Sequence, residues 1–171
     1  FVGVLYLPEH WLTIPEQNFV ATAIFILAAV TDWLDGWLAR KWNQITAFGA
    51  FLDPVADKLM VAAALVVLVQ LGRADAIAAF IIIGREITIS ALREWMAKIG
   101  ASKSVTVSFV GKLKTAAQMV AIPLLLFNGA LGPLDTAYVG RWLLDIAVVL
   151  TLVSMVYYIR MAWPEIAARS R

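Results

Sequence analysis

Four aspartates lie close together in the sequence, at spacings that place them on helical faces. Asp32 and Asp35 are three residues apart, and Asp53 and Asp57 are four residues apart, so each pair shares one side of a helix. The same two faces also contain Gly36, Ala39, Arg40 and Gly49. Because two antiparallel helices joined by a short turn can bring such faces together, we expect the four carboxylates to converge.

A cluster of carboxylates in apolar helices requires cations. Each acidic residue costs about 2.5–3.5 kcal/mol to insert at the middle of a membrane, and less near its surface. Oxygen ligands without His or Cys favour a hard ion such as Mg²⁺ or Mn²⁺, and four carboxylates balance two divalent ions. A site with two divalent metal ions typically serves phosphoryl chemistry. The alternative is that these aspartates form salt bridges with Arg40, Lys41 and Lys58, or cap the helix that begins near Ala47.

The composition indicates that these helices lie in a membrane. Of the 171 residues, 62% are hydrophobic and only 15% are charged, and the mean hydropathy is +0.83. Soluble domains are less apolar than this. Because the chain contains no Cys, disulfides, zinc–thiolate sites and thiol nucleophiles are excluded.

We expect an all-α polytopic membrane protein with six transmembrane helices, in a single domain of residues 1–171. An apolar stretch at residues 1–7, which ends at Pro8, is interpreted as the end of a truncated first helix. A helix of about 20 apolar residues spans a membrane. The other apolar runs are 18–40, 47–71, 75–97, 108–130 and 140–162.

The positive charges favour one side of this predicted bundle. If the helices alternate in direction, the turn at 41–48, the segment 98–107 and the C-terminus share a side. All of the 14 Lys and Arg residues except Arg73 and Arg141 lie nearer to that side. By the positive-inside rule this side is cytoplasmic, so the aspartates lie near the cytoplasmic boundary of the membrane.

A basic cluster lies in the same half of the bundle. Its members are Arg85, Arg93, Lys112 and Lys114. Arg85 lies inside a predicted span, where an unpaired charge is costly, so we expect a partner such as Glu86, an aspartate of the acidic cluster or a ligand anion. An acceptor substrate that carries its own phosphate suits this cluster. The other interpretation, favoured for Lys98 and Lys103, is that the basic residues follow the positive-inside rule and bind anionic lipid headgroups.

The segment from Asp32 to Asp57 fits the pattern D-x-x-D-G-x-x-A-R-x8-G-x3-D-x3-D at every specified position. In this it resembles the CDP-alcohol phosphatidyltransferases. The resemblance implies a six-helix membrane enzyme, usually a homodimer, that transfers a phosphatidyl group from CDP-diacylglycerol to an alcohol and releases CMP. It implies two divalent cations, Mg²⁺ or Mn²⁺, held by Asp32, Asp35, Asp53 and Asp57. It also implies that Asp53 and Asp57 are catalytic, with Asp57 as the base, and that the CDP site is lined by Gly36, Ala39, Arg40 and Gly49.

Further segments resemble the bacterial members of this family whose acceptor is sn-glycerol 3-phosphate. These segments are residues 51–58, 85–94 and 111–115. The resemblance implies phosphatidylglycerol phosphate as the product, made in phospholipid biosynthesis. It also implies an enzyme of the bacterial inner membrane whose active site faces the cytoplasm.

Two alternatives remain. The first is the same chemistry with another acceptor, such as serine, inositol phosphate or phosphatidylglycerol. The second is a cation transporter, because acidic residues inside membrane helices often mark ion paths. A transporter predicts polar sites that continue across the bilayer, whereas the acidic residues of the far half, apart from Asp145, lie close to the loops.

Overall fold

The computed structural model describes residues 1–42, 47–100 and 109–169, and most of these residues are helical. The long helices are α1 (Ile14–Lys41), α2 (Ala47–Gln70), α3 (Ala76–Lys98), α4 (Phe109–Phe127) and α5 (Thr136–Arg169). The short elements are the 3-10 helix η1 (Val2–Tyr6) and the strands β1 (Ala130–Leu131) and β2 (Leu134–Asp135). The predicted helical class is therefore confirmed, with one two-stranded hairpin added to it.

Within the described ranges, three helices are long and apolar enough to cross a membrane. Their apolar spans are Ile14–Ala39, Phe109–Phe127 and Thr136–Ala167. Helices α2 and α3 have comparable lengths but carry charged residues in their interiors, including Asp57 and Arg85. The apolar helices support a membrane protein, and the count of six spans remains a prediction.

The N-terminal stretch differs from the expected end of a spanning helix. Residues Val2–Tyr6 form the 3-10 helix η1, and the backbone becomes extended at Leu7, just before Pro8. Its hydrogen bonds join residues three apart, as in Leu7 N–H to the Val4 carbonyl at 3.3 Å. Such helices are short because their hydrogen-bond geometry is poorer than that of an α-helix.

Local signals explain where the long helices begin and end. Helix α1 begins at Ile14, before the apolar run at 18–40, because the Glu16 carboxylate accepts hydrogen bonds from the Thr13 backbone at 2.8 Å and from its hydroxyl at 2.7 Å. Helix α4 ends at Phe127 because Asn128 takes a positive φ of 47°. The β1–β2 hairpin then turns at Gly132, whose φ of 61° suits a two-residue hairpin loop.

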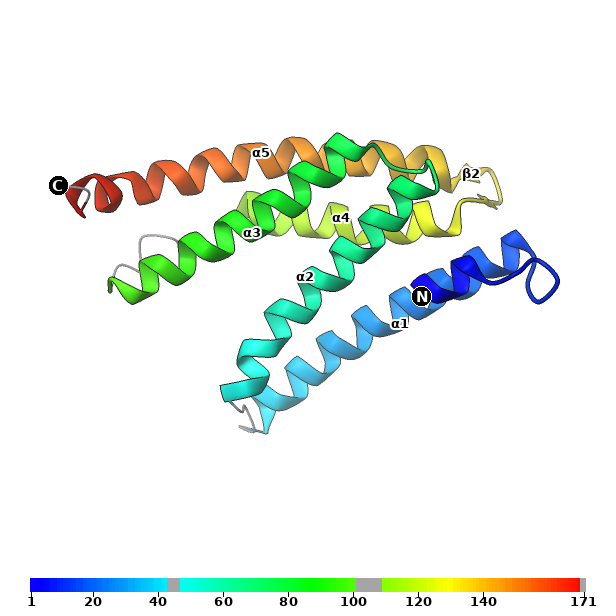
Figure 1. Cartoon of the computed structure of the whole chain (residues 1–171), viewed down its shortest axis with the longest axis horizontal. Coiled ribbons are helices and arrows are strands. Elements are labelled where there is room, and N and C mark those ends of the chain that lie inside the picture. The colour runs from blue at the N-terminus through cyan, green and yellow to red at the C-terminus, as the bar shows by residue number, and fades with distance from the viewer. Residues whose placement is uncertain (43–46, 101–108, 170–171) are drawn as a thin grey trace.

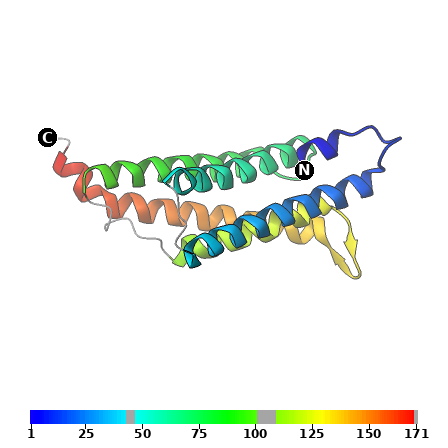
Figure 2. The ribbon, with the colours of Figure 1, turned by 90° about the horizontal axis from the view of Figure 1, so that it is seen from below.

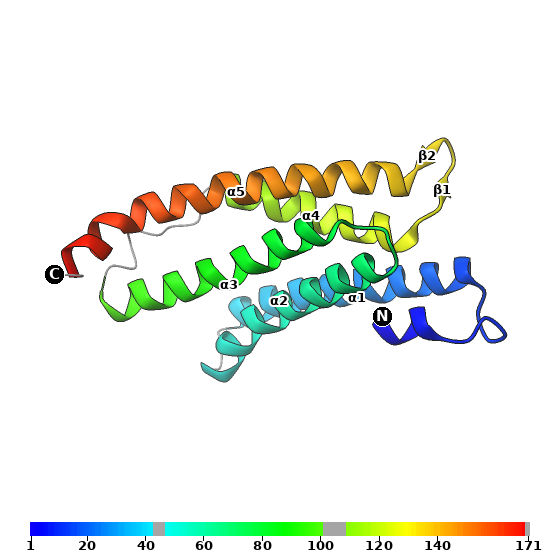
Figure 3. The same cartoon turned by 45° about the horizontal axis from the view of Figure 1, so that its top comes forward.

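The helices form two layers, which Figure 2 shows edge-on. One layer contains α2 and α3, and the other contains α1, α4 and α5. Helices α1 and α2 run antiparallel, so the C-terminal end of α1 and the N-terminal end of α2 lie at the same end of the molecule (Figure 1). The hairpin and the loop between α2 and α3 lie at the opposite end (Figure 3). This alternation agrees with the two sides expected from the sequence.

The closest packing joins α4 to α5. A Cβ atom at Gly140 would lie 2.8 Å from Cγ of the buried Leu125 and 3.2 Å from Cβ of Leu124. Small residues let membrane helices approach closely, and Gly140 has this role here. The main core continues from this contact to Phe25, Leu65, Leu68, Ile82 and Ile122, all of which are buried.

Arg73 joins three elements at the end of the molecule that holds the hairpin. Its guanidinium donates to the Leu126 carbonyl at 2.8 Å and to the Leu125 carbonyl at 3.3 Å, both at the C-terminal end of α4. It also donates to Oδ1 of Asn18 on α1 at 2.9 Å. A cation at a helix C-terminus satisfies carbonyls that lack partners within the helix. This explains why one of the two basic residues on this side is retained.

We predict that Gly140→Ala destabilises the protein by about 1–3 kcal/mol, because the new methyl group overpacks against Leu125. Thermal unfolding of the purified protein in detergent measures the change. Gly84→Ala is the matched control, since Gly84 also lies within a helix but a Cβ there meets nothing within 4 Å. An unfolding temperature for Gly140→Ala equal to that of Gly84→Ala would contradict the close contact.

Candidate active site

The acidic residues predicted to bind metal lie at one end of the molecule, on α1 and α2. Asp32 and Asp35 occupy the C-terminal part of α1, and both are exposed. Asp57 is exposed on α2, and Asp53 lies one turn before it. The side chains of Asp53 and of Arg40 lie outside the described part of the structure. Gly36, Ala39 and Gly49 lie on the same helices and are partly buried.

The structure brings the two acidic segments to the same end of the molecule. Among the side chains that the structure describes, no group of three acidic, His or Cys residues could hold a metal ion. Within the same described set, neither Asp32 nor Asp35 forms an ion pair, and Lys41 lies over the ring of Trp37 at 4.8 Å. Among the described side chains, Lys41 and Lys58 therefore do not pair with Asp32 or Asp35.

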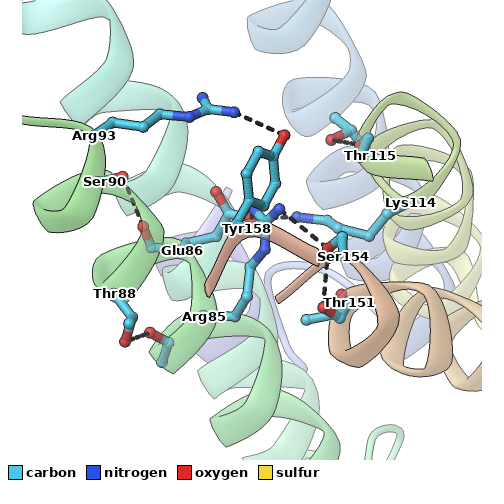
Figure 4. A network of polar contacts seen from close by, with 12 residues as sticks. Arg85, Glu86, Thr88, Ser90, Arg93, Lys114, Thr115, Thr151, Ser154 and Tyr158 are labelled. Atoms are coloured by element: carbon cyan, nitrogen blue, oxygen red, sulfur yellow. Dashed lines mark hydrogen bonds and ion pairs between the residues drawn. The ribbon is translucent and has the colours of Figure 1, made fainter. Parts of the chain in front are cut away.

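A buried network of charges joins α3, α4 and α5 (Figure 4). The Glu86 carboxylate pairs with both the Arg85 guanidinium, at 3.0 Å, and the Lys114 ammonium. The side chains of Arg85 and Lys114 are only 8% and 3% exposed. Arg85 also donates to the Ser154 hydroxyl at 3.1 Å, and Ser154 donates to the Thr151 carbonyl at 2.9 Å. The expectation that Glu86 partners Arg85 is confirmed.

Tyr158 extends this network towards Arg93. Its hydroxyl accepts a hydrogen bond from Nη2 of Arg93 at 2.9 Å, and its ring is buried. The guanidinium carbons of Arg85 and Arg93 lie 5.4 and 5.1 Å from the centre of this ring, within the range of cation–π attraction. Three members of the predicted basic cluster, Arg85, Arg93 and Lys114, therefore meet around Glu86 and Tyr158.

The fourth member, Lys112, lies on a different face of α4. It is exposed, whereas Lys114 is buried, because residues two apart in a helix point in different directions. Among the described side chains, the network therefore contains three cations, Arg85, Arg93 and Lys114, and one carboxylate, with Lys112 outside it.

The sequence interpretation missed the contribution of α5. Thr151, Ser154 and Tyr158 recur at spacings of three and four residues, so they form one polar stripe in the apolar middle of the helix. All of them are buried. This periodicity was the available signal, but polar residues in apolar helices can also make purely local hydrogen bonds.

An apolar groove lies beside the acidic end of α1. It has a volume of about 260 Å³ and is lined by Phe25, Ile26, Ala29, Val30 and Trp33 of α1 and by Met119 and Pro123 of α4. Trp33 directly follows Asp32 in the sequence, so the groove begins next to the acidic segment. A lining without charge suits a hydrocarbon chain rather than a polar substrate.

Comparison with known proteins identifies the family. The CDP-alcohol phosphatidyltransferase family model matches residues 1–153. The chain is 51% identical over 164 residues to the CDP-diacylglycerol–glycerol-3-phosphate 3-phosphatidyltransferases of Shigella flexneri serotype 5b and Escherichia coli K12, and the match covers 95% of this chain and 86% of each relative. The resemblance seen in the aspartate pattern is therefore confirmed, and the chain belongs to the CDP-alcohol phosphatidyltransferase family.

Proposed function

We propose that the protein transfers the phosphatidyl group of CDP-diacylglycerol to sn-glycerol 3-phosphate, which yields phosphatidylglycerol phosphate and CMP in phospholipid biosynthesis. The observation that carries this proposal is the 51% identity, over 95% of the chain, to relatives named for this donor and acceptor. The complete aspartate pattern on α1 and α2 supports the same chemistry.

The proposed setting is the bacterial inner membrane, with the active site facing the cytoplasm. We propose six transmembrane helices in one domain, of which the structure describes five long helices, and a homodimer as the working form. The excess of Lys and Arg at the end that holds the acidic segments supports this orientation. A site near the membrane surface gives the lipid donor access from the bilayer and the acceptor access from the cytoplasm.

The acidic cluster is proposed to hold the divalent cations on which members of this family generally depend. The residues present fit such ions, because the donors are carboxylate oxygens and the exposed Asp32 and Asp35 form no ion pair among the described side chains. We propose that Asp32, Asp35, Asp53 and Asp57 hold two ions, Mg²⁺ or Mn²⁺. When bound, these ions supply positive charge that polarises the diphosphate of the donor.

The chain's own residues then have separate roles in the transfer. Asp57, with Asp53 beside it, accepts the proton of the attacking acceptor hydroxyl. Gly36, Ala39 and Gly49 leave room for the cytidine diphosphate, and Arg40 donates hydrogen bonds to a phosphate oxygen. These CDP-binding roles follow from the family pattern on α1 and α2. An acyl chain of the donor fits the apolar groove beside Trp33.

The basic residues are proposed to bind the phosphate of the acceptor. Arg85, Arg93 and Lys114 exceed the single carboxylate of their network by two positive charges, which matches the charge of a phosphate monoester above its second pKa, about 6. The exposed Lys112 lies on α4 outside that network and is placed to meet an acceptor that arrives from the cytoplasm. An excess of positive charge inside a helix bundle is energetically costly unless an anion binds there.

The purified protein in detergent micelles should release CMP from CDP-diacylglycerol with glycerol 3-phosphate, and EDTA should abolish the release. Serine, inositol 1-phosphate and phosphatidylglycerol serve as competing acceptors in parallel assays. Release with one of these instead would keep the transfer chemistry but overturn the acceptor. No release with any acceptor, although metal still binds, would favour a cation transporter.

We predict that Asp57→Asn lowers kcat by at least about a hundredfold, because the amide can neither take the hydroxyl proton nor bind a cation as a carboxylate does. Asp53→Asn should act in the same direction. Asp145→Asn is the matched control, because Asp145 is an exposed aspartate on α5. Steady-state CMP release, with monodispersity checked by size-exclusion chromatography, measures the effect. Near-normal turnover of the Asp57→Asn variant would show that Asp57 is not the general base.

Lys112→Ala should raise the KM for glycerol 3-phosphate about fivefold while kcat changes less, because the substitution removes an attraction for the acceptor phosphate. Lys98→Ala is the control, since Lys98 is exposed and pairs with Glu94 at 2.8 Å on the same helix. Exposed pairs of this kind contribute little. If both variants raise KM equally, the effect of Lys112 comes from surface charge in general.

A further inference from the structure

Tyr158 lies beyond residue 153, where the family match ends, and nothing in the aspartate pattern gives it a role. It is only 1% exposed and packs in a small core with Ile89, Met96 and Ala162. Its hydroxyl and its ring contact Arg93, and the same ring contacts Arg85 (Figure 4). One side chain of α5 thus contacts two residues of the proposed acceptor site on α3.

The two arginines differ in how their charges are balanced. Arg85 is paired with Glu86 at 3.0 Å and hydrogen-bonded to Ser154. Among the described side chains, no carboxylate lies within ion-pair distance of Arg93. The buried Nε atoms of both arginines have no hydrogen-bond partner there. The contacts with Tyr158 therefore orient the Arg93 guanidinium without neutralising it. A fixed guanidinium that keeps its charge is suited to bind a phosphate.

We propose that Tyr158 is a positioning residue for the acceptor phosphate and holds the Arg93 guanidinium against the same ring that Arg85 contacts. Two guanidinium groups repel each other, and the electron-rich face of an aromatic ring offsets this repulsion. A flexible arginine would lose side-chain entropy on binding the acceptor, and prior orientation by the hydroxyl reduces that loss. The proposal rests on the proposed function, because it assigns Arg93 to the acceptor site.

If Tyr158 has a purely structural role, the substitution Tyr158→Phe should have a different effect. Tyr158→Phe keeps the ring, its packing and its cation–π contacts, and it removes only the hydroxyl that accepts from Arg93. If the residue only fills the core, this variant should leave the dependence on acceptor concentration unchanged. If the hydroxyl positions Arg93, the loss should appear in acceptor binding.

The test measures steady-state CMP release by the full chain in detergent, with each substrate varied while the other is saturating. For Tyr158→Phe we expect the KM for glycerol 3-phosphate to rise about tenfold, with kcat and the KM for CDP-diacylglycerol changed less than about twofold. Thermal unfolding should be unchanged. Tyr157→Phe is the matched control, since the Tyr157 side chain is 45% exposed, and all of its parameters should equal those of the wild type.

A double-mutant cycle with Arg93→Ala tests whether Tyr158 acts through Arg93. Arg93→Ala should raise the acceptor KM by itself, and adding Tyr158→Phe should raise it no further. The proposal is overturned if Tyr158→Phe leaves the acceptor KM unchanged, if the two effects multiply, or if the variant unfolds earlier and loses activity towards both substrates equally. A wild-type protein that never uses glycerol 3-phosphate overturns the proposed function itself, whereas an active wild type with a silent Tyr158→Phe overturns this inference alone.

Discussion

The pairing of Glu86 with Arg85 and Lys114 holds together the part of the bundle in which α3, α4 and α5 meet. A charge buried without a partner is so unfavourable that removing one member of a buried pair typically costs about 3–5 kcal/mol. Here a single carboxylate from α3 pairs with a neighbour on its own helix and with a lysine on α4. Ser154 of α5 accepts a further hydrogen bond from Arg85. The relative positions of the three helices are therefore linked to one carboxylate.

Near the hairpin, the partly buried charge of Arg73 also needs partners, and these differ from those of Arg85 and Lys114. Arg73 is satisfied there by backbone carbonyls at the end of α4 and by the Asn18 side chain on α1, without a carboxylate. Neutral oxygens can satisfy a guanidinium near the C-terminal end of a helix, because the carbonyls there carry partial negative charge and lack partners in the helix. In the described part of the structure, charges at the two places are therefore satisfied differently, by the Glu86 carboxylate in one and by neutral oxygens around Arg73 in the other.

The acidic groups lie on α1 and α2 and the basic network joins α3, α4 and α5, and this division suits the proposed transfer reaction. The donor diphosphate and the acceptor phosphate are both anions, so they must be brought together against their mutual repulsion. Carboxylates that hold cations on α1 and α2, and a separate set of cations between α3, α4 and α5, would give each anion its own source of positive charge. The apolar groove beside Trp33 provides a place for hydrocarbon next to the acidic segment.

The amino-acid sequence by itself determined the helical class, the approximate helix boundaries and the family, because these depend on local hydrophobic runs and on an aspartate pattern with fixed spacing. It also predicted Glu86 as a partner of Arg85, since an internal charge requires one and Glu86 is adjacent. It could not determine that Lys114 is buried while Lys112 is exposed, or that Tyr158 contacts two arginines from another helix. Those facts depend on which face of each helix meets its neighbours. The long-range contacts between α3 and α5 decide this, and they join residues more than 60 positions apart, as in the pairs of Arg85 with Ser154 and Arg93 with Tyr158.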